Sequence, residues 1–192
     1  MTRPIRPEPG GRTPAPGDLG LVQSFVNTRD IENGTDLFGS TDDVAAWCRD
    51  FTGLPVDDLD AVEFATVIEL REALRAACGA NHGGQPLPDH AAAALDRAAA
   101  EARPRIRFGT GNGDRLEPSV GGIRGVLGRI AVATFNARHS GEWQRLKACS
   151  RDECQWVFYD QSRSQTSRWC SMRVCGNREK VRNYQTRNRQ TP

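Results

Sequence analysis

The chain contains the segment Cys149-Ser-Arg-Asp-Glu-Cys154 and, after fifteen further residues, Cys170-Ser-Met-Arg-Val-Cys175. These two segments are the main indication of how the C-terminal part folds. Four residues separate the two cysteines of each pair. Two such pairs are typical of a tetrahedral zinc site, in which two turns each supply two thiolates. Four protein ligands leave no position for water, so we expect one structural Zn²⁺ and no catalytic metal. An iron–sulfur cluster and a chance grouping of thiols remain as alternatives.

The segment around these cysteines is too short to build a hydrophobic core of its own. We therefore expect metal binding to supply most of its folding free energy, about 10–16 kcal/mol in comparable zinc peptides. Four thiolates around one Zn²⁺ leave a net negative charge. Lys147, Arg168 and Arg173 are close enough in sequence to offset this charge from outside the ligand set.

The charge of the chain is unevenly distributed. Residues 147–192 contain 10 Lys and Arg against 4 Asp and Glu, a net charge of +6, whereas residues 1–146 contain 16 against 20, a net charge of −4. A basic C-terminal segment on an acidic body favours a polyanionic partner for that segment. Nucleic acid is the simplest such partner.

The basic side chains of this segment occupy a polar loop at residues 160–168 and a helix predicted from Asn177 onward. Val181 and Tyr184 are expected to face inward on that helix, with arginines on another side. An arginine-bearing helix after a zinc site can enter the major groove and contact guanine in a bidentate manner. The alternative is a solvated basic surface without a partner. The candidate nucleic-acid contacts are Arg163, Arg168, Arg178, Lys180, Arg182, Arg187 and Arg189.

The N-terminal part has the periodicity of a mostly helical α+β domain over residues 18–140. Residues 1–17 are rich in Pro and Gly and are expected to form a disordered leader. Alternating residues at 105–108 and 115–120 around a Gly-rich turn predict one β-hairpin. Ser140-Gly141 marks the expected boundary between this domain and the C-terminal segment that contains the four cysteines. Helices are predicted from about 18, from 40 or 41, and over about 58–80, 89–102 and 123–138.

Few side chains of the N-terminal part stand out as functional candidates. Asn27, Thr28 and Arg29 close the first helix and could line a polar ligand pocket, although helix capping explains them equally well. Cys48 and Cys78 lie on apolar helix faces and are expected to be core thiols. We find no catalytic triad, paired carboxylates or open metal site, and therefore expect no enzyme.

The chain has no apolar run long enough for a transmembrane helix, and its first residues lack the apolar stretch of a signal peptide. These features predict a cytoplasmic protein without a membrane partner.

Several motifs together resemble a known family. Leu146-Lys147, Trp156 to Asp160, Arg168 to Met172 and Cys175-Gly-Asn-Arg178 resemble the bacterial CGNR zinc finger over residues 146–188. The segment from Leu19 to Thr28 resembles the opening of the ABATE domain, which usually precedes that finger. The resemblance implies a stress-induced transcription regulator whose N-terminal domain senses a ligand or signal.

The sequence thus predicts a zinc-dependent, DNA-binding transcriptional regulator. The finger would bind DNA, and the N-terminal domain would sense a small molecule or form a homodimer. An adaptor whose finger binds a protein or RNA is the main alternative. An enzyme with a pocket near Asn27 to Asp30 is the remaining one.

Overall fold

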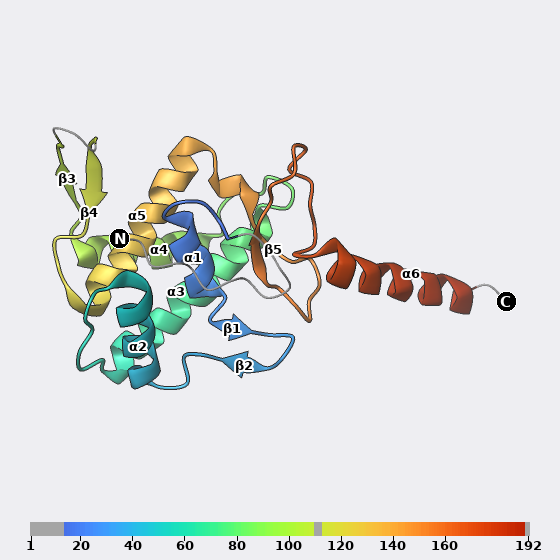
Figure 1. Cartoon of the computed structure of the whole chain (residues 1–192), viewed down its shortest axis with the longest axis horizontal. Coiled ribbons are helices and arrows are strands. Elements are labelled where there is room, and N and C mark those ends of the chain that lie inside the picture. Colours follow the sequence, from blue (N-terminus) through green and yellow to red (C-terminus); the bar gives the residue numbers. More distant parts are fainter. Residues whose placement is uncertain (1–13, 110–112, 191–192) are drawn as a thin grey trace.

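The ends of the long helices follow directly from the local sequence. In this computed structural model, which describes residues 14–109 and 113–190, the Ser40 hydroxyl accepts a hydrogen bond from the Asp43 N–H and begins α2, which ends at Gly53 with a φ of 69°. Five helices span the N-terminal part of the described chain (Figure 1): α1 Leu19–Val26, α2 Thr41–Thr52, α3 Ala61–Ala80, α4 Asp89–Ala102 and α5 Gly122–Ser140.

Helix α3 begins later than its apolar periodicity indicates. Asp58 has a φ of 52°, outside the helical region, and the Asp60 carboxylate accepts a hydrogen bond from the Glu63 N–H. The Glu63 side chain in turn accepts one from the Asp60 N–H, which completes a capping box. The capping residue, and not the first apolar one, therefore sets this boundary.

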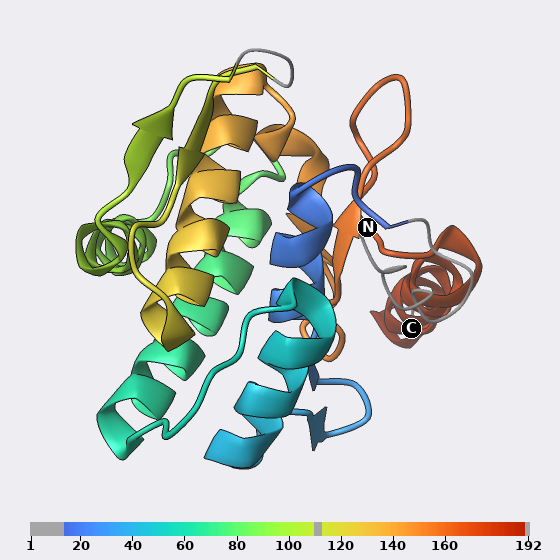
Figure 2. The same ribbon diagram turned by 60° about the vertical axis from the view of Figure 1, so that its left-hand side comes forward.

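Helix α4, seen nearly end-on in Figure 2, packs against α3 and α5, and α1 packs against the same two helices. The close approach of α4 and α5 depends on Gly128, because a Cβ there would lie 2.2 Å from the Ala102 Cβ. Cys48 and Cys78 are both buried in this core, as predicted. Burial raises the pKa of the Cys48 thiol to about 12, which agrees with an inert packing role.

Three antiparallel hairpins complete the described part of the fold and confirm the α+β class. The predicted hairpin pairs β3 Arg105–Arg107 with β4 Arg115–Glu117. A second hairpin, β1 Arg29–Asp30 with β2 Thr35–Asp36, was not predicted, because strands of two residues are too short to show an alternating pattern. The third pairs β5 Leu146–Ala148 with β6 Val157–Tyr159.

The hydrophobic core does not divide at residues 140–141, where we expected a domain boundary. Gly141 ends α5 in the left-handed conformation, and the chain then returns to the helices. Trp143, Leu146 and Val157 are buried in the same core as α1, α3 and α5. The β5–β6 hairpin therefore belongs to the N-terminal core as well as to the cysteine segment.

The expected leader falls largely outside the described residues, which begin at Pro14. Ala15, within that leader, is buried at 2% exposure, and its N–H donates to the Gln23 Oε1 over 2.6 Å. The packed chain therefore begins before Asp18. Within the described ranges, no helix combines the length and apolar character needed to cross a bilayer.

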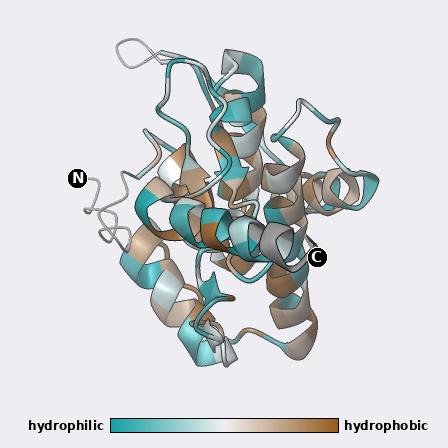
Figure 3. Cartoon of the chain, turned by 90° about the vertical axis from the view of Figure 1, so that its right-hand side faces the viewer, coloured by the Kyte–Doolittle hydropathy of each residue, from teal (hydrophilic) through white to brown (hydrophobic). Residues whose placement is uncertain are grey.

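The C-terminal helix α6, Asn177–Gln190, has a different environment from the others. It extends away from the body of the molecule and packs mainly on the short π-helical turn η2, Met172–Gly176 (Figure 1). Figure 3 faces this end of the molecule and shows α6 mostly hydrophilic. A helix of this length is only marginally stable in water when it has no packing partner. The exposed surface of α6 is therefore available to a binding partner.

Candidate metal centre and nucleic-acid interface

The four cysteines of the two pairs come together as a buried cluster. The sulfur atoms of Cys149, Cys154, Cys170 and Cys175 all lie within 4.8 Å of one another. The Sγ of Cys170 is 3.7 Å from that of Cys154 and 3.6 Å from that of Cys175. A tetrahedral site with Zn–S bonds of about 2.3 Å requires sulfurs about 3.8 Å apart. The cluster is thus sized for a single zinc ion, whereas a cluster of several irons needs a wider arrangement.

The first cysteine pair is positioned by the β5–β6 hairpin. The Cys149 N–H donates to the Trp156 carbonyl over 2.9 Å, which continues the ladder beyond β5. The chain then turns so that the Cys154 N–H donates to the Arg151 carbonyl, also over 2.9 Å. Gln155 completes the turn with a φ of 46°. These bonds fix both sulfurs on one side of the turn.

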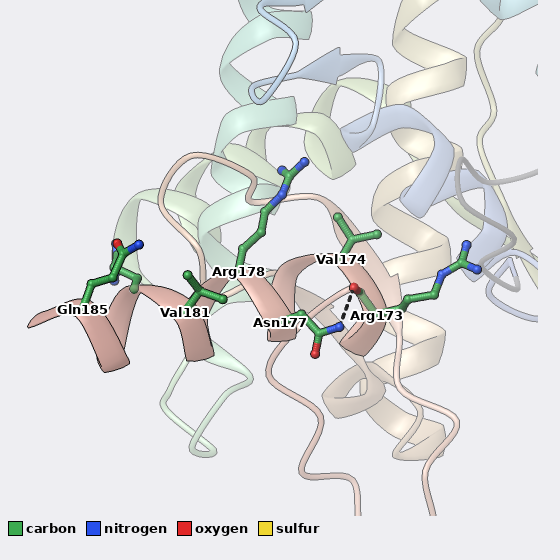
Figure 4. A pocket seen from close by; sticks show the side chains of 7 residues that line it. Arg173, Val174, Asn177, Arg178, Val181 and Gln185 are labelled. Atoms are coloured by element: carbon green, nitrogen blue, oxygen red, sulfur yellow. Dashed lines mark hydrogen bonds between the residues drawn. The ribbon is translucent and has the colours of Figure 1, made fainter. Parts of the chain in front are cut away.

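In the second pair, Cys170 precedes η2 and Cys175 lies within it, and the Ser171 side chain starts that turn by accepting a hydrogen bond from the Val174 N–H. The Asn177 Nδ2 donates to the Arg173 carbonyl over 3.0 Å and thereby joins η2 to α6 (Figure 4). The metal centre and the start of α6 therefore form one continuous unit.

The cation nearest the cluster is not one of those expected. The Arg151 Nη1 lies 3.8 Å from the Cys175 Sγ, where its charge offsets the thiolates. Lys147 instead donates to the Asp160 carboxylate over 2.9 Å, and the Arg168 guanidinium lies over the Trp169 ring. Arg151 lies inside the first cysteine pair and was not among the cations expected to offset the thiolates.

Asp160 organises the polar loop that was expected to contact phosphates. Its carboxylate accepts hydrogen bonds from the hydroxyls of Ser162 and Ser167 at 2.6 and 2.8 Å, and from Lys147. Burial opposes ionisation, but these hydrogen bonds outweigh it and hold the pKa of Asp160 below its usual range. The two hydroxyls are thus used within the loop, and the exposed Arg163 and Arg168 remain as candidate contacts.

The described basic side chains of α6 lie on the surface, beside three acidic ones. Arg178 forms an ion pair with Glu32, in the β1–β2 turn. The Arg182 Nη2 is 2.9 Å from the Glu179 Oε1, and its Nη1 is 3.7 Å from the Glu153 Oε1. Lys180 is also exposed. The side chains of Arg187 and Arg189 lie outside the described part, although both positions fall within α6.

One side of α6 and the adjoining turn η2 form a shallow groove (Figure 4). It combines apolar and basic side chains. Val181 and Tyr184 were expected to face inward, but they are 55% and 61% exposed, because within the described part of the chain α6 packs mainly on η2. The lining residues are Arg173, Val174, Asn177, Arg178, Val181, Arg182 and Gln185.

Two family models match the chain in the order in which the structure arranges it. The CGNR zinc finger matches residues 145–188, and ABATE, described as "Putative stress-induced transcription regulator", matches residues 19–137. The chain belongs to the ABATE family. Its C-terminal segment is a CGNR zinc finger, and the four cysteines are the residues placed to hold one zinc ion. No curated protein matches the chain.

Two of the three ABATE residues suggested as ligand contacts, Asn27 and Thr28, make hydrogen bonds within the protein. The Asn27 side chain donates to the Val157 carbonyl and accepts from the Val157 N–H, both over 2.8 Å. The Thr28 hydroxyl donates to the Phe25 carbonyl at the end of α1. Arg29 is exposed and lies 3.7 Å from Glu72. The first of these side chains extends the β5–β6 hairpin and docks the finger on the ABATE domain.

Three further buried polar side chains were not predicted, and two of them, Arg75 and Asn81, join the ABATE domain to the finger. The buried Arg75 donates from Nη1 to the Gln155 carbonyl and from Nη2 to the Val26 carbonyl. The Asn81 Nδ2 donates to the carbonyls of Trp143 and Leu146. Arg71, at 1% exposure, is paired with Asp36 in β2. In the sequence, the only indication of such a residue is a polar side chain among the apolar residues that share one face of a helix.

Proposed function

We propose that this ABATE protein is a zinc-dependent, DNA-binding transcriptional regulator. The finger would contact DNA through α6, and the ABATE domain would sense a small molecule or mediate dimerisation. The observation that carries the proposal is a basic, solvent-exposed helix that starts directly at the metal centre and projects from the body. Its exposed Arg178, Lys180 and Arg182 suit contacts with phosphates and with base edges.

The acidic body and the basic finger support DNA over a protein partner. The net charge of +6 over residues 147–192 attracts a polyphosphate without any need for a complementary protein surface. The exposed Val181 and Tyr184 add apolar area beside the arginines, which suits contact with thymine methyl groups. The regulator would act in the cytoplasm and catalyse no reaction.

The test replaces Arg182 with Ala in the zinc-loaded full-length protein. Its ion pairs with Glu179 and Glu153 are exposed and contribute at most about 1 kcal/mol to stability, so the fold is expected to survive. If Arg182 contacts a phosphate, DNA affinity falls and the slope of log affinity against log salt becomes shallower by about 1. Arg97→Ala, on α4 and likewise exposed, is the matched control.

Titrations against duplex DNA at several salt concentrations show whether Arg182 contacts DNA. An Arg182→Ala protein with the affinity and slope of the unmodified chain would show that this side of α6 does not meet DNA. The same titrations with single-stranded RNA test the adaptor alternative, which predicts tighter binding to RNA than to the duplex.

A further inference from the structure

A cavity of about 490 Å³ lies in the ABATE domain, on the side of α1 and α5 that adjoins β4. It is bounded by the start of α1, the segment after α2, strand β4 with the following loop, and one side of α5. Its volume is in the range of small-molecule sites, which are mostly apolar with a few polar groups. The apolar lining consists of Leu21, Leu54, Leu116, Pro118, Val120 and Val132.

Two arginines and two carboxylates line this cavity, and three of these four groups are already accounted for. The Arg115 Nε is 3.3 Å from the Glu117 Oε2. Glu117 also pairs with Arg107 and Arg105, and these contacts lower the pKa of Glu117 to about 2. Asp18 is exposed at the start of α1. None of these groups is a free, partly buried charge.

Arg129 differs from them. It is half-buried on the side of α5 that faces the cavity, between Gly125 and Val132. Its Nη1 donates to the Thr52 carbonyl over 3.2 Å, at the end of α2. Among the residues that the structure describes, no carboxylate lies within ion-pair distance of it. A guanidinium beside apolar walls, with donors to spare, is suited to a planar anion.

We propose that this cavity binds a small amphipathic carboxylate. Its apolar body would contact Leu21, Leu54 and Leu116, and its carboxylate would accept hydrogen bonds from the Arg129 guanidinium. The site gives the ligand-sensing part of the proposed function a place in the ABATE domain, and only its regulatory meaning rests on that function. Binding is measured without DNA, so failure of the site and failure of the regulator are distinguishable.

The cavity beside the metal centre is less suited to a ligand. It is lined by His82, Lys147 and Arg168 among others. The Lys147 ammonium, however, already donates to Asp160 and to the Gln165 carbonyl. Arg168, the other cation of that cavity, is exposed, whereas the Arg129 guanidinium is half-buried and has donors to spare.

The experiment titrates the zinc-loaded full-length protein with a panel of alkyl and arylalkyl carboxylates, from hexanoate to decanoate and including phenylbutyrate. Each acid is compared with its primary amide, which has the same shape and no charge. Calorimetry gives the affinities, and the backbone amide signals of Gly125 and Leu116 in NMR spectra report the place of binding. At least one acid is expected to bind saturably there, about tenfold more tightly than its amide.

Two variants and a control make the assignment specific. Arg129→Gln is expected to remove the preference for acid over amide, and Val132→Trp, which fills the cavity, to abolish binding of both. Arg124→Gln, five positions earlier on α5 and paired with Glu63 and Glu101, is expected to change neither. If Arg129→Gln does not fold, Arg129→Lys is used in its place. Lysine keeps the charge but loses the planar fork, so the affinity for the acid must still fall. The proposal is overturned if no acid binds, if acids and amides bind equally, or if the Arg129 variants retain the preference.

Discussion

Single residues of the Cys-Gly-Asn-Arg motif connect parts of the molecule that lie far apart in sequence. Cys175 is a zinc ligand, and Asn177 ties η2 to α6 through the Arg173 carbonyl. Arg178 forms an ion pair with Glu32, which also lies 3.4 Å from Arg151. Because Arg151 contacts the Cys175 sulfur, the β1–β2 turn of the ABATE domain is linked both to the metal centre and to α6.

This link leads to a prediction about Glu32, which competes with phosphate for Arg178. Glu32→Gln keeps the shape of the side chain and removes its charge, so Arg178 becomes available to DNA. We expect DNA affinity to rise by roughly three- to tenfold at low salt, with a steeper salt dependence. Glu69→Gln changes the net charge equally but lies on α3, paired with Arg97. Equal gains in DNA affinity from both variants would show that the Glu32 effect comes from the change in net charge and not from its pairing with Arg178.

Asp160 allows a prediction about stability and pH. Asp160→Asn leaves the buried Lys147 ammonium without its carboxylate and should lower the free energy of unfolding by about 3–5 kcal/mol at neutral pH. The pKa of Asp160 lies below its usual range in the folded state, so its stabilisation is present above a pH of about 4 and lost as the pH falls further.

Urea unfolding of the unmodified chain and the Asn variant across pH measures this difference. The two curves should converge under acid conditions, because the Asp160 contribution disappears from the unmodified chain. A constant gap between them down to low pH would mean that the carboxylate charge is not what stabilises the loop.

At the scale of elements, the β5–β6 hairpin determines how the two family domains are combined. One end of it positions Cys149 and Cys154, while Leu146 and Val157 are buried in the ABATE core. The paired cysteine spacing predicts the metal centre well, because thiolate geometry is a local property. The docking by Asn27 could not be predicted, because its partner is a backbone group 130 residues away.

A prediction follows for Asn27→Ala. The change leaves the Val157 N–H without its partner in a buried position, so the free energy of unfolding should fall by about 1–3 kcal/mol. Because the same hairpin carries two zinc ligands, zinc should also pass to a chelator faster. Asn33→Ala, in the exposed β1–β2 turn, is the control. Unchanged zinc release would show that the finger folds independently of the ABATE domain.

At the scale of the whole molecule, sequence patterns predicted the bounds of the helices better than which other elements cover them. Helix α4 has the predicted bounds of residues 89–102, and α2 begins at Thr41, in agreement with the predicted start at 40 or 41. Val181 and Tyr184 were placed inward because helical periodicity indicates which residues share a face, but not whether another element covers that face. Their exposure is also what leaves α6 available to a partner.

Genomic DNA capture would test whether this molecule binds DNA through α6 in a zinc-dependent manner. Sheared genomic fragments are incubated with the zinc-loaded protein, and the retained fragments are sequenced. Chelated protein and a chain shortened to end at Gly176 serve as the two controls.

We predict that the zinc-loaded protein enriches fragments sharing a common site, and that both controls lose this enrichment. Retention of the same fragments by the shortened chain would contradict the assignment to α6. Absence of any enrichment by the zinc-loaded protein would contradict the DNA-binding function itself.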